Sequence, residues 1–112
     1  MKQLVGDVRG RAPLIVDDML STGATVAAAV RALLAAGCTP DITVVVTHGL
    51  FAPPADQVLR DLPIARVITT NSVAPRADLA LPVHVVDIAP LLAEVIRRLD
   101  RDESLMDLIS HG

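Results

Sequence analysis

Residues 14–25 have the sequence Leu14-Ile15-Val16-Asp17-Asp18-Met19-Leu20-Ser21-Thr22-Gly23-Ala24-Thr25, and this stretch decides the fold. An apolar run ends in two adjacent carboxylates, and a turn of small residues with three hydroxyl groups follows. Apolar side chains then recur at helical spacing until about Ala36. The pattern predicts a strand over 14–17, a loop and a helix, with Gly37 just past the end of the helix. Open α/β sheets bind ligands at such strand ends.

The remainder of the chain repeats this alternation of strand and helix. Segments rich in β-branched residues predict strands at 42–47, 66–70 and 83–87. We expect a short helix opened by Pro53-Pro54 that buries Val58 and Leu62, and a longer one at Ala89–Asp100. Residues 102–104 cap a last short helix, and residues 1–13 form turns with a small hairpin arm. The predicted fold is α/β, with a mainly parallel sheet of about four strands and flanking helices in a single domain spanning 1–112.

Composition excludes several classes of function. The chain is 52% apolar but only 1% aromatic, which indicates an aliphatic core of the kind found in parallel sheets. The net charge of −3 provides no basic field, so neither nucleic acid nor an anionic membrane is an expected partner. A single cysteine, Cys38, and the lack of an apolar segment after Met1-Lys2-Gln3 predict a cytoplasmic protein.

The residues around the acidic pair suit a ligand that carries both hydroxyls and a phosphate. Ionised carboxylates accept hydrogen bonds from hydroxyls, and the amides at a helix start bind anions. A purely structural interpretation is also available, because acids favour a helix N-terminus and Ser21 or Thr22 can serve as its N-cap. Capping and anion binding use the same free amides, so both can hold.

Several motifs resemble one family, the ribose-phosphate pyrophosphokinases, which synthesise phosphoribosyl pyrophosphate. The acidic loop looks like the phosphoribosyl-binding loop of the type I phosphoribosyltransferase fold. The motifs that narrow the match are Val5-Gly6-Asp7-Val8-Arg9-Gly10-Arg11, Thr47-His48-Gly49-Leu50-Phe51, Ala89-Pro90-Leu91-Leu92-Ala93-Glu94-Val95-Ile96-Arg97-Arg98 and Glu103-Ser104-Leu105. The resemblance runs from about Val5 to about Ile109.

The resemblance implies a role for each part of the site. Asp17 and Asp18 bind the 2- and 3-hydroxyls of ribose, and the loop of Ser21, Thr22, Gly23, Ala24 and Thr25 holds the 5-phosphate. Ala24 replaces a glycine that is common in the family. The expected pocket rim comprises Thr47, His48, Gly49, Asn71 and Ser72, although a structural hydrogen bond explains His48 equally well.

A metal ion and a nucleotide are implied only by the resemblance to this family. No spacing of His, Cys and carboxylates predicts a metal site formed by the protein itself. Mg²⁺ is expected to be held by the phosphates of the ligand and by water. ATP is implied only if a complementing chain supplies its site.

The catalytic set predicted for this chain is incomplete. Three cationic residues, Lys2, Arg9 and Arg11, precede the acidic loop, and none resembles the mobile basic loop of the family. Three functions stay open: the part of a pyrophosphokinase that binds ribose 5-phosphate or phosphoribosyl pyrophosphate, inactive alone; a non-catalytic subunit associated with a synthetase; and a minimal phosphoribosyltransferase. An exposed sheet edge predicts a homo-oligomer or a complex with a synthetase chain.

Overall fold

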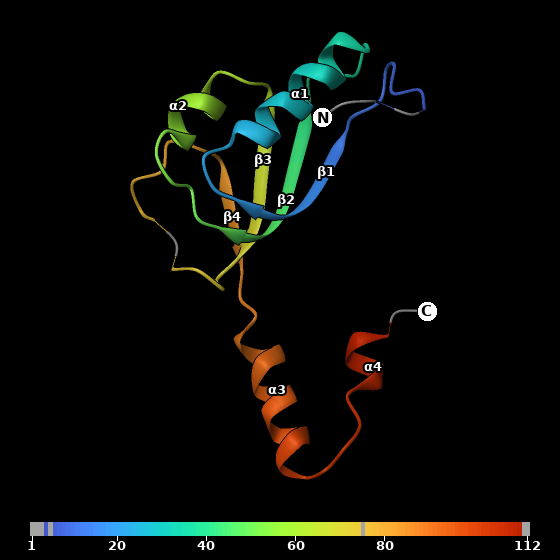
Figure 1. Ribbon diagram of the computed structural model, residues 1–112, viewed down its shortest axis with the longest axis vertical. Helices are drawn as coiled ribbons and strands as arrows, with labels where there is room; N and C mark the ends of the chain where they lie inside the picture. The colour runs from blue at the N-terminus through green and yellow to red at the C-terminus, as the bar shows by residue number, and fades with distance from the viewer. Residues whose placement is uncertain (1–3, 5, 75, 111–112) are drawn as a thin grey trace.

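Four parallel strands form the sheet of this protein, as Figure 1 shows. The computed structural model describes residue 4 and residues 6–74 and 76–110. The strands are β1 (Leu14–Leu20), β2 (Ile42–Gly49), β3 (Ile64–Thr70) and β4 (Val83–Val86), and they lie in the order β1-β2-β3-β4. The predicted α/β fold with a four-stranded parallel sheet and flanking helices is confirmed.

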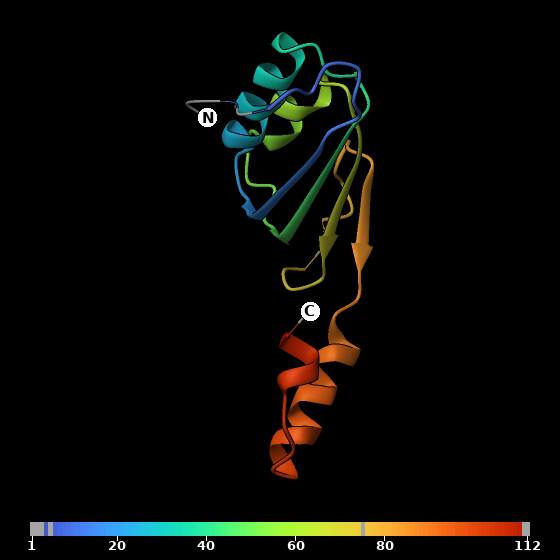
Figure 2. The same ribbon diagram turned by 90° about the vertical axis from the view of Figure 1, so that its right-hand side faces the viewer.

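The connections between the strands lie on one face of the sheet. Strand order follows chain order, and right-handed crossovers between successive neighbours must then all pass over the same face. Helix α1 (Ala24–Ala35) and helix α2 (Ala55–Arg60) cover that face, as Figure 2 shows from the side. The core forms between them and the sheet, and its largest fully buried side chains are Leu20, Val30, Ile42, Val44, Val46, Leu59 and Val67.

The opposite face of the sheet is uncovered by the described residues. Strand register places Val16, Val45 and Ile68 side by side on this face. Leu14 and Val16 are 62% and 69% exposed, as expected for an aliphatic edge strand. We call this surface the open face, defined by Leu14, Val16, Val45, Ile68 and Val86. The described chain therefore forms one half of a doubly wound arrangement.

The predicted end of the first helix at Gly37 is confirmed. Gly37 follows the C-cap Ala36 with φ +90°, and its amide donates to the Leu34 carbonyl at 3.0 Å. The Cys38 amide donates to the Leu33 carbonyl at 3.1 Å, which completes a Schellman motif.

Other expectations are wrong. Strand β1 extends to Leu20 because it pairs with β2 as far as Gly49, so the acids do not end the strand. In α2 the buried residues are Ala55 and Leu59, whereas Val58 and Leu62 are only half-buried. Residue 4 and residues 6–13 form no strand, so the hairpin arm is absent there, and the rest of that expectation falls outside the described residues.

The last two helices extend away from the sheet. Helix α3 (Ala89–Asp100) continues beyond the carboxyl end of β4, and α4 (Met106–Ile109) lies beside it (Figures 1 and 2). We call residues 89–110 the arm. Among the described residues, none of its apolar side chains joins the core of the sheet. No helix in the described ranges has the length and apolar character to cross a membrane.

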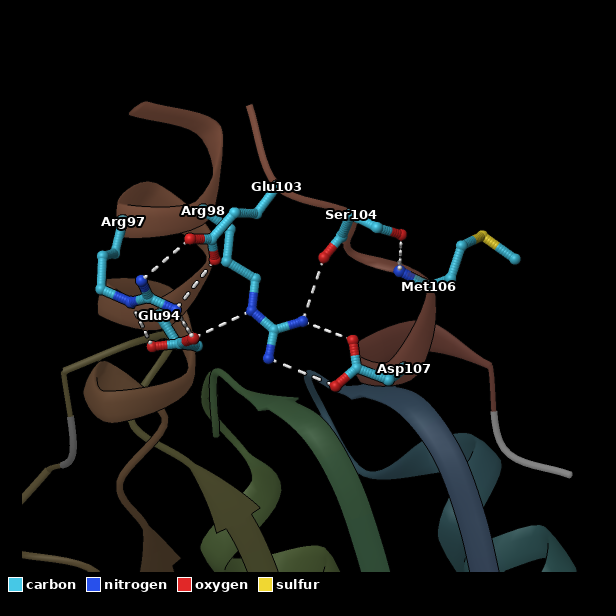
Figure 3. Close-up of polar contacts among 7 residues, drawn as sticks. All are labelled: Glu94, Arg97, Arg98, Glu103, Ser104, Met106 and Asp107. Atoms are coloured by element: carbon cyan, nitrogen blue, oxygen red, sulfur yellow. Dashed lines mark hydrogen bonds and ion pairs between the residues drawn. The ribbon is translucent and has the colours of Figure 1, made fainter. Parts of the chain in front are cut away.

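A network of ion pairs joins α3 to α4 (Figure 3). Glu94 accepts hydrogen bonds from Arg97 Nη2 at 2.5 Å and from Arg98 Nε at 2.9 Å. Arg97 also pairs with Glu103 at 3.2 Å, and Arg98 also pairs with Asp107. Arg98 Nη1 further donates to the Ser104 carbonyl at 3.0 Å. The bonds from Arg97 and then Arg98 lower the pKa of Glu94 to about 2.

This pKa predicts how the arm responds to acid. A carboxylate whose pKa is lowered on folding contributes stability above its ordinary pKa of about 4.5, and loses that contribution as pH falls toward 2. Asp107 in α4 accepts from Arg98, and this bond lowers its pKa too. We expect α4 to separate from α3 as acid protonates Glu94 and Asp107, while both helices stay joined at neutral pH. An NMR pH titration of the Ser104 to Asp107 amides measures this directly.

A variant tests the same network at neutral pH. In Glu94→Gln the charge that joins both arginines is lost, and hydrogen exchange of the Met106 and Asp107 amides should accelerate. Asp100→Asn is the matched control, because it removes a carboxylate from the same helix that makes no ion pair among the described residues. Equal exchange rates in the two variants would show that Glu94 does not help to hold α4 by orienting the two arginines.

Candidate functional site

The acidic pair lies in the second half of β1, near the carboxyl edge of the sheet. Asp17 is half-buried and Asp18 is exposed. The Asp18 amide donates to Asp17 Oδ1 at 2.8 Å, so part of the acceptor capacity of Asp17 is used locally. The remaining carboxylate oxygens are free to accept hydrogen bonds from a polyhydroxylated ligand.

A small cavity opens where β1 passes into α1. Its volume is about 140 Å³, and it is lined by residues 19–26, which include the whole predicted phosphate loop. The Ala27 amide donates to the Gly23 carbonyl at 2.8 Å as the first bond of the helix. The amides of residues 24–26 therefore have no acceptor within the helix. They are the groups that bind an anion at a helix start.

The helix has no side-chain cap. Gly23 is the N-cap, with φ +86° and ψ 0°, and no side chain accepts from the first turn. The interpretation of Ser21 or Thr22 as N-cap is thus wrong, because the left-handed turn at Gly23 places both residues outside the cap position. Ala24 is the first residue of α1, so its methyl group adds no strain. The helix start is left available to a ligand.

The second and third strands bring most of the predicted rim together. Register pairs Met19 with His48 and Leu20 with Gly49 across β1 and β2. His48 Nδ1 lies 2.7 Å from Ser72 Oγ, and that hydroxyl donates to the Thr47 carbonyl at 3.2 Å. These bonds fix the imidazole ring at the carboxyl edge of the sheet.

Asn71 does not join this rim. Its Nδ2 donates to Asp87 Oδ1 at 2.9 Å, and its Oδ1 accepts from the Ile88 amide at 3.0 Å. The Ala89 amide donates to Asp87 Oδ1 at 2.9 Å, and this bond, followed by the one from Asn71, lowers the pKa of Asp87. We call these bonds the clamp between β4 and α3. The sequence feature that could have predicted the clamp is an aspartate, Asp87, two residues before the expected start of a helix.

Gly49 has a packing role beside the site. A Cβ on this residue would lie 2.5 Å from Phe51 Cε2 and 2.9 Å from Thr69 Oγ1, so no larger residue fits. Phe51 is buried at 3% exposure, and its amide donates to the Leu20 carbonyl at 3.2 Å. The glycine thus allows the only phenylalanine of the chain to close the end of β2.

The two arginines before the acidic loop lie at the other edge of the sheet. Arg9 pairs with Asp7 at 3.1 Å, and Gly10 donates to the Gly37 carbonyl beyond the end of α1. The Arg11 carbonyl accepts from Thr39 at 2.8 Å, before β2 begins. Both residues are therefore at the amino edge, whereas the site is at the carboxyl edge. In the part of the chain that the structure describes, no group of three or more His, Cys, Asp or Glu residues could hold a metal ion.

Fold and site together define a class of protein. This is a parallel α/β domain in which a strand, a tight loop and an uncapped helix start place two carboxylates beside free amides. A family model described as "Phosphoribosyl synthetase-associated domain" matches residues 2–110. The chain belongs to this family, and the resemblance inferred from its motifs is confirmed.

Comparison with individual proteins supports the same family assignment. The chain is 40% identical over 110 residues to ribose-phosphate pyrophosphokinase 4 of Saccharomyces cerevisiae, covering 97% of this chain and 33% of the relative. It is 37% identical to the ribose-phosphate pyrophosphokinase of Streptomyces coelicolor, over 95% of this chain and 33% of the relative. The crystal structure of phosphoribosylpyrophosphate synthetase from Mycobacterium smegmatis superposes with a TM-score of 0.81 at 38% identity, covering 88% and 33% of the two chains. The chain thus spans about a third of the length of these relatives.

The loop geometry predicts a cost for replacing Gly23. A Cβ there would lie 3.1 Å from Leu59 Cγ, and the positive φ is strained for any L side chain. Gly23→Ala should lower the free energy of unfolding by about 1–2 kcal/mol from backbone strain alone, with a further cost from crowding. Chemical denaturation measures this.

Gly10→Ala is the matched control. Gly10 also has a positive φ, of +69°, but a Cβ there meets nothing within 4 Å. This variant carries the strain without the crowding. Equal destabilisation by the two substitutions would show that Leu59 moves aside freely and does not constrain the loop.

Proposed function

We propose that this chain binds ribose 5-phosphate or phosphoribosyl pyrophosphate, as the part of a ribose-phosphate pyrophosphokinase that holds this sugar phosphate. The observation that supports this best is the placement of Asp17 and Asp18 in the second half of β1, the strand that leads into the uncapped start of α1. Acceptors for hydroxyls and donors for a phosphate then lie within one short stretch of backbone. The membership of the chain in the family supports the same assignment.

Each group has a defined role in this proposal. The carboxylates of Asp17 and Asp18 accept hydrogen bonds from the 2- and 3-hydroxyls of the ribose. The amides of the loop and the first turn of α1 donate to the 5-phosphate, together with the exposed hydroxyls of Thr22 and Thr25. The described residues offer too few ligands for a metal site of their own. Mg²⁺ would therefore be carried by the ligand phosphates and water, where it neutralises their charge.

Binding is tested by NMR titration with ribose 5-phosphate in the presence of Mg²⁺. We expect saturable shifts of the amides of residues 21–25. The double variant Asp17→Asn, Asp18→Asn should bind at least about tenfold more weakly, because each charge-assisted hydrogen bond contributes roughly 1.5–3 kcal/mol.

The control for this titration removes the same charge elsewhere. Asp41→Asn, Asp61→Asn changes two exposed carboxylates at the amino edge of the sheet and should leave the affinity unchanged. If the wild-type loop amides do not shift in a folded sample, the binding proposal is wrong. Equal weakening in both double variants would mean that the acidic pair acts only through net charge.

The proposal also predicts that the chain alone does not form phosphoribosyl pyrophosphate. Transfer of a diphosphate group from ATP depends on cationic groups and metal ions around the phosphates. Residues 19–26, which line the cavity, include no lysine or arginine. We expect no product from ATP and ribose 5-phosphate with this chain, and product formation when it is co-expressed with the amino-terminal two thirds of a synthetase. Turnover by the isolated chain, measured by release of AMP, would contradict the proposal.

A second function is favoured by a different observation. The open face and the arm present large apolar surfaces, which are typical of a subunit that associates with another chain. In this alternative the chain assembles with an intact synthetase and changes its activity without completing a catalytic site. Modulation of an intact synthetase, without restoration of activity to a truncated one, supports the alternative.

A further inference from the structure

Phe51 has an unusual backbone conformation directly after the end of β2. Its φ is +49°, in the left-handed region, and among the described residues only Asp102 shares a positive φ without being a glycine. This conformation is unfavourable for an L side chain, and it persists only where the surroundings fix it. Residues held in this way are frequent at functional sites. The contacts around Phe51 must therefore hold the turn in place.

Three contacts hold Phe51. Its ring is buried and lies against Gly49, where there is no room for a side chain. Its amide donates to the Leu20 carbonyl at 3.2 Å. Its carbonyl accepts from Arg76 Nη1 at 2.6 Å. In the ranges that the structure describes, Arg76 is the only side chain that forms a hydrogen bond with the backbone of Phe51.

Arg76 is itself oriented by a second partner. Its Nε and Nη2 donate to the two carboxylate oxygens of Asp78 at 3.2 and 3.1 Å, and these bonds lower the pKa of Asp78. Arg76 also lines a cavity of about 240 Å³ together with Asp56, whose Oδ1 is buried and has no hydrogen-bond partner within the described residues. The guanidinium is thus committed to Phe51 and Asp78 although another carboxylate is close. A planar group held along one edge is well suited to fix one carbonyl.

The predicted phosphate loop is supported by Phe51 in two places. Leu20, whose carbonyl accepts from the Phe51 amide, directly precedes residues 21–25 and lines the same cavity as they do. On the other side, the chain turns at Phe51 toward α2, and Leu59 of this helix lies against Gly23, 3.1 Å from the place of a Cβ. The conformation of Phe51 therefore affects both supports of the loop.

We propose that Arg76 is a positioning residue for the phosphate loop. By holding the Phe51 carbonyl it fixes the left-handed turn, and through Leu20 this turn fixes the amides that donate to the phosphate. Residues 19–26 line the cavity of the site and do not include Arg76, so its action passes through Phe51 instead of through contact with the ligand. The inference rests on the proposed function, because it concerns how the same loop is held.

Hydrogen exchange of the ligand-free chain tests this role. In Arg76→Ala the turn can relax, the bond to the Leu20 carbonyl opens more often, and the Phe51 amide should exchange at least about tenfold faster, because hydrogen bonds from charged groups are among the stronger ones. The amide signals of residues 21–25 should shift as well. Exchange of the Val30 amide, in the core, should stay unchanged, which separates a local effect from a loss of overall stability.

Two further variants serve as controls. Arg60→Ala removes the same kind of side chain from α2, where Arg60 lies 4.0 Å from Asp61 on the surface, and should leave the exchange of Phe51 unchanged. Arg76→Lys keeps the positive charge but lacks the planar fork that holds Asp78 and the Phe51 carbonyl together. It should therefore behave like Arg76→Ala.

Titration with ribose 5-phosphate and Mg²⁺, followed by NMR, connects the turn with binding. The affinity should fall roughly 2- to 30-fold in Arg76→Ala and Arg76→Lys, the range found for residues that act on a site through others, and stay unchanged in Arg60→Ala. A residue that only attracted the phosphate by its charge would be replaced successfully by lysine. Equal weakening in the two Arg76 variants thus supports positioning.

Three results would overturn the proposal. The first is a Phe51 amide that exchanges in Arg76→Ala as slowly as in the wild type. The second is a uniform acceleration that includes Val30, which would assign Arg76 to general stability. The third is full affinity in Arg76→Lys while the Phe51 amide still exchanges fast. If the wild type does not bind ribose 5-phosphate, the proposed function is wrong, and the exchange measurement alone then decides whether Arg76 positions the loop.

Discussion

The handedness of the strand connections is the constraint on which the rest of this structure depends. Strand order repeats chain order, and right-handed crossovers then place α1, α2 and the chain between β3 and β4 on one face. That face contains the described core. The same constraint leaves the open face without a helix, and it brings all four strands to one carboxyl edge. Both the candidate site and the open face follow from a single rule of chain topology.

The candidate site combines groups whose positions follow directly from the strand, the loop and the helix start. Free amides at the start of α1 exist in any helix, and here a left-handed glycine removes the usual side-chain competitor. The carboxylates of Asp17 and Asp18 lie near the carboxyl edge of the sheet. Such groups suit the proposed binding of a phosphorylated sugar, whereas residues 19–26, which line the cavity, include no positively charged side chain.

Much of this was predictable from sequence, because periodicity and turn chemistry act locally. The span of α3, the Schellman ending at Gly37 and the four strands all follow from patterns within a few residues. Three features depend on partners that are distant in sequence. β1 extends past Asp18 because β2 pairs with it as far as Gly49. Asn71 serves the clamp because Asp87 reaches it, and the apolar stripe of α3 remains exposed because the clamp directs the helix away. No local pattern contains these pairings.

The packing of Phe51 against Gly49 has a consequence for spectroscopy. With one phenylalanine and neither tryptophan nor tyrosine, the protein has almost no absorbance at 280 nm and no useful intrinsic fluorescence. Ring-current shifts in its proton spectrum arise from this one phenylalanine, which is buried at the end of β2 beside Leu20 and Thr69, and from the three histidine rings. Because His48 lies in β2 and Phe51 just after it, protons shifted by these two rings report on the region next to the cavity at the end of β1. The protein therefore contains its own local probes of the site, with no background from tryptophan or tyrosine.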